Sequence, residues 1–418
     1  MEKVCVLGLG YIGLPTASVL ATNGFRVLGV DVSPRVVDTV NAGNIHIEEP
    51  GLHTVVRAAA NSGNLRAALE PEPSDVFIVA VPTPLNADKT ADMTYVRRAT
   101  ESIVPHLRRG ALVILESTSP PGTCTDLMRP ILERSGLAVG TDIYLAHCPE
   151  RVLPGRILKE LIENDRVIGG YDPASAERAR ELYASFVEGD IFLTNATTAE
   201  MVKLAENTFR DVNIALANEM ARLCEGLGID FWEMSRYANR HPRVNIHSAG
   251  PGVGGHCISV DPWFLVEKQP EQAQLIHLAR QRNDAVPMHV AETVKTLVAG
   301  VESPKIAALG LAYKGNVDDV RESPSLHVIE HLREMGLTVA VYDPHVDLEE
   351  LPQAGLAAAL DGADCLVLLT DHDEYKDIAP EQAAGLMRRA VLYDTRNQLD
   401  HAAYREAGFQ VRVLGIGE

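Results

Sequence analysis

Residues 3–13 read Lys-Val-Cys-Val-Leu-Gly-Leu-Gly-Tyr-Ile-Gly, and residues 26–31 read Arg-Val-Leu-Gly-Val-Asp. The first stretch is an apolar strand pattern that runs into three glycines with the spacing G-x-G-x-x-G. A helical pattern follows, and the second stretch is a strand pattern that ends in an acid. Glycines at this spacing allow a tight turn and the close approach of a diphosphate to a helix N-terminus. The two stretches therefore predict a β-α-β unit that binds a dinucleotide, and a β-α-β turn without a phosphate is the alternative. The residues concerned are Gly8, Gly10, Gly13 and Asp31.

The acid at the end of the second strand indicates which dinucleotide binds. Asp31 lies 18 residues after Gly13. Its carboxylate can accept hydrogen bonds from both hydroxyls of a ribose, and its charge would repel a 2′-phosphate. The sequence therefore favours NAD over NADP as the cofactor.

Three further apolar runs read as buried parallel strands, because each ends in turn residues. They span residues 76–81, 111–115 and 143–146. Ligands of a doubly wound sheet lie beyond the carboxyl ends of its strands. We therefore expect residues 81–83 and 117–118 to form walls of a cofactor site or active site. By the same rule Glu150 and Arg151 lie at this edge, although an acid on a surface loop is the alternative for Glu150.

Residues 197–226 are predicted to form one long helix, because apolar residues recur at helical spacing and glycines follow. Thr197 and Glu200 have the spacing of a capping box at its start. Three polar residues farther along share one face, since they stand at i, i+4 and i+7. Such a stripe suits an anionic, oxygen-rich ligand, and a solvated face is an alternative of equal weight. A subunit interface is a further use for so long a helix. The three residues are Lys203, Asn207 and Arg210.

Residues 250–263 read Gly-Pro-Gly-Val-Gly-Gly-His-Cys-Ile-Ser-Val-Asp-Pro-Trp. The glycines let a ligand approach the main chain, and the loop ends at Cys257, with Asp261 four residues later. This layout indicates a thiol presented to a ligand, and an ordinary buried cysteine is the alternative.

Several basic residues between 236 and 243 precede the loop and would suit a diphosphate, with scattered surface arginines as the alternative. The histidines near Cys257 match no familiar zinc spacing, so no metal is expected.

A second α/β unit is predicted from residue 304 onward. Its strand patterns cover residues 305–309, 337–342, 363–370 and 391–394, and a helix covers 325–334. The second of these strands again ends in an acid, Asp343, but no G-x-G-x-x-G accompanies it. We therefore expect an α/β fold with two Rossmann-like doubly wound domains joined by a central helical domain that contains the long helix. The expected domains are 1–196 for the cofactor, 197–300 for the central domain and 301–418 for the substrate.

The composition is that of a globular protein of two or three domains, with 418 residues, 46% hydrophobic and 23% charged. No apolar run is long enough to predict a membrane span, and the start enters a strand pattern without a signal peptide. The six cysteines are scattered, which favours a reducing cytoplasm. The net charge of −19 argues against binding to nucleic acid or to an anionic membrane.

These patterns together resemble the UDP-glucose/GDP-mannose dehydrogenase family over the whole chain. Besides the glycine fingerprint, the shared motifs are Val-Pro-Thr-Pro (81–84), Glu-Ser-Thr (116–118), Pro-Glu-Arg (149–151), Lys-Leu-x-Glu-Asn (203–207), Gly-Val-Gly-Gly-His-Cys-x-x-x-Asp (252–261) and Tyr-Lys…Arg-Glu-Ser (313–323). Three stretches, at 41–50, 150–155 and 238–246, most resemble the branch that acts on UDP-N-acetyl-D-mannosamine. The branch that acts on UDP-N-acetylglucosamine is the alternative, because the sequence does not reveal the configuration at C2 of the sugar.

The resemblance implies oxidation of the C6 alcohol of a nucleotide sugar to a carboxylate, with two NAD⁺ consumed. An aldehyde must add a nucleophile before a second hydride can leave, and a thiolate adds and leaves well. Cys257 would therefore carry a thiohemiacetal and then a thioester, which water hydrolyses. The implied catalytic residues are Cys257, Lys203 and Asn207 at the reacting carbon and its oxyanion, Asp261 as a partner of the water and of Lys203, Glu150 as acid or base, and Thr118 for holding the water.

The resemblance also implies binding residues. The cofactor contacts expected are Gly8, Gly10, Tyr11, Ile12, Gly13, Asp31, Arg35, Val81, Pro82, Thr83, Ser117, Thr118 and Arg321. The contacts expected for a UDP-N-acetylhexosamine are Glu150, Arg151, Val152, Leu153, Lys203, Asn207, Arg210, His241, Arg243, Gly250, Gly252, Gly254, Tyr313, Lys314 and Arg396. His241 or Arg243 is expected to reach the substrate of a neighbouring subunit, since the family forms its site across a homodimer.

Two other functions remain open from the residues alone. A β-hydroxyacid dehydrogenase also pairs a Rossmann domain with a helix that carries Lys-x-x-x-Asn, but it gives no role to Cys257 or to the second α/β unit. A non-catalytic NAD-binding protein is the alternative from a different class.

Overall fold

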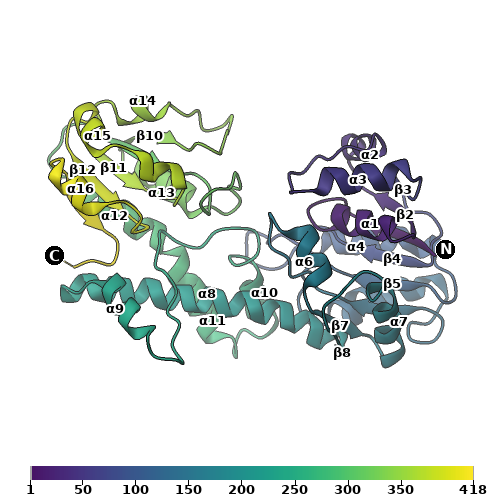
Figure 1. Cartoon of the computed structure of the whole chain (residues 1–418). Coiled ribbons are helices and arrows are strands. Elements are labelled where there is room, and N and C mark those ends of the chain that lie inside the picture. The colour runs from purple at the N-terminus through teal and green to yellow at the C-terminus, as the bar shows by residue number, and fades with distance from the viewer. Residues whose placement is uncertain (1, 418) are drawn as a thin grey trace. The chain divides into compact units, whose positions relative to one another are not determined.

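The computed structural model describes residues 2–417 and divides into two compact units. The N-terminal unit comprises Met1–Glu206 and Trp263–Pro270, and the C-terminal unit comprises Asn207–Pro262 and Glu271–Glu418. Each unit contains one sheet (Figure 1).

The sheet of the N-terminal unit has eight strands in the order β3-β2-β1-β4-β5-β6-β7-β8. The first six are mutually parallel, whereas β7 runs antiparallel to β6 and parallel to β8. The first six strands have the order of a dinucleotide-binding sheet. The bounds are β1 Lys3–Leu7, β2 Arg26–Val30, β3 Leu65–Ala68, β4 Val76–Val79, β5 Leu112–Leu115, β6 Tyr144–His147, β7 Arg166–Gly170 and β8 Ile191–Asn195.

Helices cover both faces of this sheet, because its central strands are apolar and buried on both sides. One face packs against α1 Gly13–Thr22, α2 Pro34–Asn41, α3 Leu52–Asn61, α6 Ile157–Glu163 and α7 Pro173–Tyr183. The other face packs against α4 Thr94–Ile103, the π-helix η2 Thr123–Met128 and α5 Arg129–Leu132. Two single 3₁₀ turns, η1 Val104–His106 and η3 Glu133–Ser135, also belong to the unit.

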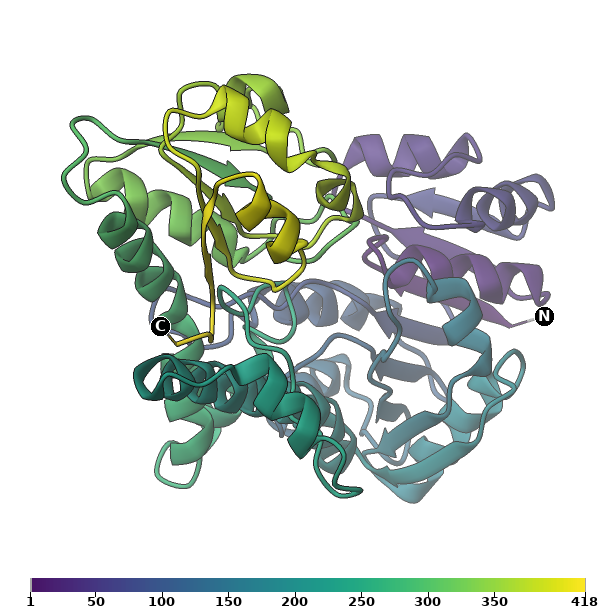
Figure 2. The same ribbon diagram turned by 60° about the vertical axis from the view of Figure 1, so that its left-hand side comes forward.

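The sheet of the C-terminal unit has five parallel strands in the order β10-β9-β11-β12-β13. They are β9 Lys305–Leu309, β10 Thr338–Tyr342, β11 Cys365–Leu368, β12 Val391–Asp394 and β13 Gln410–Val413. This is the doubly wound order 2-1-3-4-5, whose ligand crevice lies where the connections diverge, between the first and third strands. One face packs against α12 Val286–Leu297 and α13 Pro324–Glu334, and the other against α14 Leu356–Leu360, α15 Pro380–Leu386 and α16 His401–Glu406 (Figure 2). The 3₁₀ turn η4 spans Asp373–Asp377.

The long helix α8 runs from Ala196 to Leu227, close to the predicted 197–226 (Figure 1). The remaining helices are α9 Phe231–Ala238, α10 Asp261–Lys268 and α11 Gln274–Asp284. The predicted fold class, two doubly wound sheets with a central helical region, is confirmed. No helix among residues 2–417 combines the length and the apolarity that a membrane crossing would need.

The predicted capping box at the start of α8 is wrong. Asn195 caps the helix instead, because its side-chain oxygen accepts a hydrogen bond from the Thr198 N–H at 2.8 Å. The Glu200 carboxylate is fully buried and accepts from the backbone N–H groups of Gly122 and Cys124, at 2.6 and 2.9 Å. It therefore satisfies the start of η2, a partner that lies nearly 80 residues away in sequence and is invisible to a local pattern.

Candidate functional site

The three glycines of the fingerprint serve different purposes. Gly8 has φ +91°, and a Cβ added there would lie 2.4 Å from the Ala80 oxygen. A Cβ at Gly13 would lie 1.8 Å from the Gly8 oxygen, so both residues are required by the protein's own packing. A Cβ at Gly10 would meet no protein atom within 4 Å. The chain therefore needs no glycine at position 10 for its own fold, which fits a surface that a diphosphate approaches closely.

Asp31 joins the end of β2 to this glycine loop. Its Oδ2 accepts from the Leu9 N–H at 3.0 Å, and its Oδ1 accepts from the Ser33 N–H at 2.9 Å. The side chain is only partly buried, and each oxygen can accept a further hydrogen bond. His46 is a half-buried residue beside Asp31, to which sequence reasoning assigned no role. Burial lowers the pKa of its ring, and the charge of Asp31 opposes that effect.

The other expected cofactor residues lie at the same edge of the sheet. Ile12 is half-buried, whereas Tyr11, Arg35 and Pro82 are exposed. The turns after β4 and β5 are joined by hydrogen bonds: the Val81 N–H donates to Ser117 Oγ at 2.9 Å. Thr83 Oγ1 likewise donates to the Thr118 oxygen at 2.7 Å. The structure thus brings together the ends of β1, β2, β4 and β5 as one wall, and these residues fit a dinucleotide.

Glu150 is buried, which excludes the surface-loop alternative. Its Oε2 accepts from Arg166 Nη1 at 2.8 Å, and the side chains are 7% and 4% exposed. The register of the antiparallel pair explains this contact, because Ala146 pairs with Gly170 and His147 with Gly169. Continued by three residues, that register sets position 150 opposite position 166. Sequence reasoning missed Arg166 because β7 was not predicted.

The loop after Glu150 is held by a second buried acid that sequence reasoning also missed. The Glu49 carboxylate accepts from the Gly155 and Ile157 N–H groups, each at 2.8 Å, at the start of α6. Arg151 is ion-paired with Glu206 at 2.7 Å. The expected substrate residues of this loop therefore stand on a fixed backbone, with Val152 half-buried and Leu153 exposed.

In the C-terminal unit the glycine-rich loop packs against the segment that follows β9. A Cβ at Gly254 would lie 2.6 Å from the Tyr313 Cβ, and Gly255 has φ +85° with its N–H bonded to the Arg321 oxygen at 3.0 Å. A Cβ at Gly252, with φ +139°, would lie 2.8 Å from the Pro324 Cβ. The loop therefore needs its glycines to lie close to this segment, which is a tertiary reason for the composition read from the sequence.

Arg396 lies under the same loop. Its Nε donates to the Leu369 oxygen at 2.9 Å, and its Nη1 lies 3.1 Å from the position of a Cβ on Gly250. Burial lowers the pKa of its guanidinium, and the charges of Asp371 and Asp394 oppose that effect. Gly250, Tyr313 and Arg396 thus meet at the carboxyl edge of β9, β11 and β12, where a ligand of this sheet is expected.

Cys257 is half-buried, and its carbonyl accepts from the Asp261 N–H at 2.8 Å in the turn before α10. The charge of Cys257 is among the causes that raise the pKa of Tyr313, after burial and Asp319, so the two side chains are neighbours. The Asn207 amide, fully buried, donates to Asp261 Oδ2, and Arg210 donates to the Asn207 oxygen. Two of the three residues in the predicted polar stripe of α8 are therefore in direct contact, and the solvated-face alternative fails for Asn207.

The remaining expected residues are less enclosed. Lys203 is half-buried one turn before Asn207 on α8, and Lys314 is exposed. Arg321 forms a bidentate ion pair with Asp319, at 2.9 and 2.6 Å. His241 and Arg243 lie on an exposed loop after α9.

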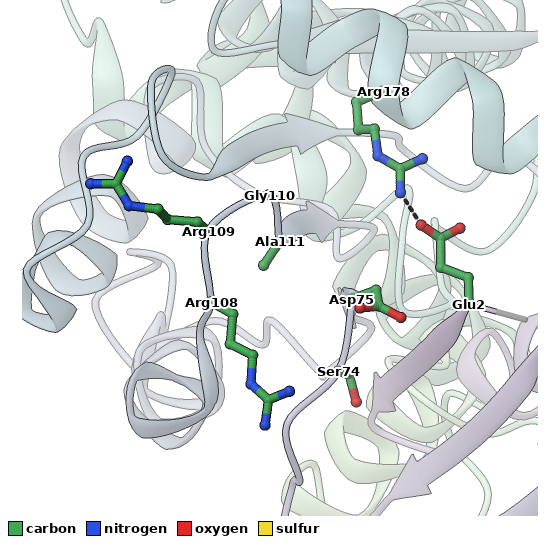
Figure 3. Close-up of a pocket in the computed structure, with 8 residues that line it drawn as sticks. All are labelled: Glu2, Ser74, Asp75, Arg108, Arg109, Gly110, Ala111 and Arg178. Carbon is green, nitrogen blue, oxygen red and sulfur yellow. Dashed lines mark hydrogen bonds and ion pairs between the residues drawn. The ribbon is translucent and has the colours of Figure 1, made fainter.

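A cavity of about 340 Å³ lies at the opposite edge of the N-terminal sheet (Figure 3). It is bordered by Glu2, Asp75 and Ala111, which precede β1, β4 and β5. Two of its three arginines are engaged, Arg178 with Glu2 and Arg109 with Asp142 at 2.5 Å. Since dinucleotides bind beyond the carboxyl ends of such strands, this cavity is not the cofactor site.

A dinucleotide-binding sheet, a second doubly wound unit and a cysteine on a glycine-rich loop define an NAD-dependent dehydrogenase of two α/β units. The chain belongs to the UDP-glucose/GDP-mannose dehydrogenase family, as the resemblance predicted. Residues 2–187 match its NAD binding domain, residues 197–285 its central domain and residues 307–401 its UDP binding domain. The prediction of NAD as cofactor is confirmed by this match. The same matches exclude the alternative of a β-hydroxyacid dehydrogenase.

The relatives cover all or nearly all of the chain. UDP-N-acetyl-D-mannosamine dehydrogenase of Methanococcus maripaludis is 50% identical over 100% of this chain and 98% of its own. NDP-N-acetyl-D-galactosaminuronic acid dehydrogenase of Ralstonia solanacearum is 48% identical over 94% of this chain and 96% of its own. The solved structure of a UDP-D-ManNAc dehydrogenase from Pyrococcus horikoshii matches with a TM-score of 0.93 and 44% identity, over 99% of each chain.

Proposed function

We propose that this protein oxidises the C6 alcohol of UDP-N-acetyl-D-mannosamine to the carboxylate of UDP-N-acetyl-D-mannosaminuronate. Bound NAD⁺ supplies the hydride acceptor for each of two oxidations. The observation that carries the proposal is the glycine-rich loop, which ends at Cys257 and packs against the UDP-binding unit. Relatives that bear this activity in their names support the choice of sugar.

Cys257 is the nucleophile of the second oxidation. Its sulfur forms a bond to the aldehyde carbon, and the aldehyde oxygen becomes the hydroxyl of a thiohemiacetal. Loss of a hydride and of the hydroxyl proton then gives a thioester. Water adds to that carbon and the C–S bond breaks. One proton of the water goes to the departing thiolate, the other is released to a base, and the carboxylate leaves.

The polar side chains of α8 stabilise the oxygen at C6. Lys203 and Asn207 lie one helical turn apart, so a cation and an amide donor can face one oxygen. The Asn207–Asp261 hydrogen bond fixes the amide, so that it does not have to reorient as negative charge develops. Asp261 also orients the water and Lys203.

Glu150 acts as the general base for the hydrolytic water, and Thr118 holds that water. Arg151, Val152 and Leu153 contact the sugar nucleotide. The remaining substrate contacts are Arg210, Gly250, Gly252, Gly254, Tyr313, Lys314 and Arg396, and Arg321 serves the NAD diphosphate. His241 or Arg243 serves the substrate of a neighbouring subunit.

A Cys257→Ala variant tests the thioester route. We expect it to abolish formation of the acid while leaving NAD binding intact. The matched control is Cys224→Ala, which removes a different buried thiol from α8 and should retain turnover. Conversion to the acid by Cys257→Ala would overturn the mechanism.

The substrate is tested with a panel of UDP-ManNAc, UDP-GlcNAc, UDP-GalNAc, UDP-glucose and GDP-mannose, with NADH followed by absorbance. We expect the highest kcat/KM with UDP-ManNAc and about two NADH per sugar, since each hydride transfer carries two of the four electrons. The alternative of a UDP-N-acetylglucosamine 6-dehydrogenase predicts preference for UDP-GlcNAc. No NADH with any sugar would support the non-catalytic alternative.

We further propose that the protein is a homodimer formed through α8. Four large apolar side chains of α8 follow one another at spacings of seven, seven and four residues, so they share one face. They are Phe209, Leu216, Leu223 and Leu227, exposed by 62%, 45%, 59% and 70%. An apolar stripe of this size that is exposed to solvent favours contact with another protein.

Leu223→Arg tests this interface. We expect it to shift the mass in light scattering from dimer to monomer, whereas Arg222→Ala, an exposed residue of α8 outside the apolar stripe, should remain dimeric. A monomeric wild type would contradict the proposal.

We also propose a cytoplasmic location, because the cysteines are scattered along the sequence. The division at residues 196 and 300 into cofactor, central and substrate domains is likewise proposed, with support from the three family matches.

A further inference from the structure

Behind Glu150 lies a second buried carboxyl that the proposed mechanism does not use. Glu116 is the first residue after β5 and is 2% exposed. Its Oε1 accepts from the Tyr183 hydroxyl of α7 at 2.6 Å. Thr16, in the first turn of α1, is a further polar neighbour. Glu116 therefore lies between the helix that follows the glycine fingerprint and the loop that carries Glu150.

One arginine is shared by this group of acids. Arg166 pairs with Glu150 at 2.8 Å, and its guanidinium lies over the Tyr183 ring, 5.3 Å from the centroid. With both carboxyls ionised, two negative charges face one positive charge among side chains that are nearly buried. Burial of unbalanced charge is costly, so one proton on the pair is favoured.

The proton is held by Glu116. Burial, followed by the charge of Glu150, raises the pKa of Glu116 to about 7, against the hydrogen bond from Tyr183 and the charge of Arg166. Cys148 completes the set of titratable neighbours, and burial raises the pKa of its thiol to about 12, so it stays neutral. Burial also raises the pKa of Tyr183 well above its usual range, so it remains a hydrogen-bond donor.

We propose that Glu116 is a positioning residue that sets the base strength of Glu150 by holding or releasing a buried proton. This inference rests on the proposed role of Glu150 as general base. With Glu116 neutral, Arg166 balances Glu150 alone. When Glu116 loses its proton to solvent, the added negative charge makes Glu150 a stronger acceptor for the proton of the hydrolytic water. The coupling is reciprocal, since the charge of Glu150 acts on Glu116 in the same way.

The sign of the pH dependence follows. The charge on Glu116 is absent below its pKa of about 7 and present above it, so kcat should rise as pH passes upward through that value. Glu116→Gln keeps the shape and the acceptor for Tyr183 but cannot ionise. We expect the rise to be lost, with kcat on the alkaline side lower by roughly 3- to 10-fold, the range for one pKa unit of coupling transmitted partly to the rate.

Tyr183→Phe provides a second, opposite readout. It removes the hydrogen bond that favours ionised Glu116, so the rise in kcat should move to higher pH rather than vanish. A purely structural role would lower kcat equally at every pH. Both variants are compared with wild type in thermal melting and NAD binding, so that a misfolded variant is recognised.

Infrared difference spectra of the whole protein, taken below and above neutral pH, keep the proposal falsifiable without turnover. Wild type should lose the carbonyl stretch of a protonated carboxylic acid on going alkaline, and Glu116→Gln should lack that change. Identical spectra or superimposable pH profiles for wild type and Glu116→Gln would overturn the inference. Failure of wild type to oxidise any UDP-sugar would instead overturn the proposed function.

Discussion

The two α/β units end their second strand in the same way and use the resulting aspartate differently. Asp31 follows β2 and Asp343 follows β10, and each accepts from the N–H after a positive-φ glycine: Leu9 after Gly8, and Leu311 after Gly310. The local backbone is thus repeated.

The surroundings of the two carboxylates differ. Asp343 is 4% exposed and also accepts from the N–H groups of Ala312, His345 and Val346 and from the His372 ring at 3.0 Å. Asp31 accepts hydrogen bonds from two backbone N–H groups and remains partly exposed. Asp31 can therefore bind a ribose, whereas the oxygens of Asp343 are already occupied by hydrogen bonds within the C-terminal unit.

The helices after the two glycines differ as well. In the N-terminal unit α1 begins at Gly13, five residues after Gly8, so its N-terminus can face a diphosphate. In the C-terminal unit α13 begins only at Pro324, after a long segment that carries Tyr313, Lys314 and Arg321. The second unit therefore has cationic side chains and a packed glycine-rich loop at the edge where the first unit has a helix N-terminus.

The largest effect is expected from Asp343→Asn. Losing the charge weakens the hydrogen bond that Asp343 accepts from the buried His372 ring and four backbone hydrogen bonds. We expect the C-terminal unit to lose about 3 kcal/mol of stability, as for the loss of a buried charged acceptor of hydrogen bonds. Thermal melting measures this, with Asp31→Asn as the matched control that should melt close to wild type. Equal melting of both variants would break the comparison.

Asp31→Asn should instead act on the cofactor. The variant loses a charged acceptor for ribose hydroxyls, worth about 1.5–3 kcal/mol, so the Kd for NAD should rise about 10- to 100-fold. Titration of protein fluorescence with NAD measures it. In folded protein that carries Asp343→Asn, the Kd for the UDP-sugar should change less. An unchanged Kd for NAD in Asp31→Asn would show that Asp31 does not bind the cofactor.

Stability at acid pH should depend on Asp343, whose carboxylate is held by hydrogen bonds. Burial alone would raise the pKa of Asp343, but its hydrogen bonds from His372 and the backbone lower it from 3.8 to about 2. A depressed folded pKa means that the stabilisation is complete above about pH 4 and is lost as pH falls toward 2, a loss of about 2 kcal/mol. Melting temperatures across this window should fall less steeply in Asp343→Asn than in wild type.

The smallest effect is expected from Gly10→Ala. Its Cβ meets no protein atom, so melting should not change, but it faces the approaching diphosphate and should weaken NAD about tenfold. Gly310→Ala is the comparison variant, since a Cβ there would lie 2.3 Å from the Thr370 Cβ at φ +100° and should destabilise the fold. Unchanged NAD affinity in Gly10→Ala would show that this glycine serves neither ligand nor fold.

Apolar runs predicted most of the central strands, because a strand buried on both faces must be apolar. The strand β7 was missed: Arg166-Val-Ile-Gly-Gly has two large apolar residues and starts with a charge. That charge is the partner of Glu150, so a residue that weakens the strand pattern of β7 is the one that contacts the site. The capping box failed for a similar reason, since Glu200 found better partners in η2.

By itself the sequence determined the two α/β units, the NAD fingerprint, the long helix and the residue types of the site. These follow from local periodicity and from glycine chemistry, which need only neighbours along the chain. Only the tertiary structure decided which of two equivalent aspartates stays available and which buried acid faces Glu150. It also showed that Glu49 anchors the loop after Glu150. Those outcomes depend on partners far away in sequence, and the burial that makes them strong exists only once the sheet has formed.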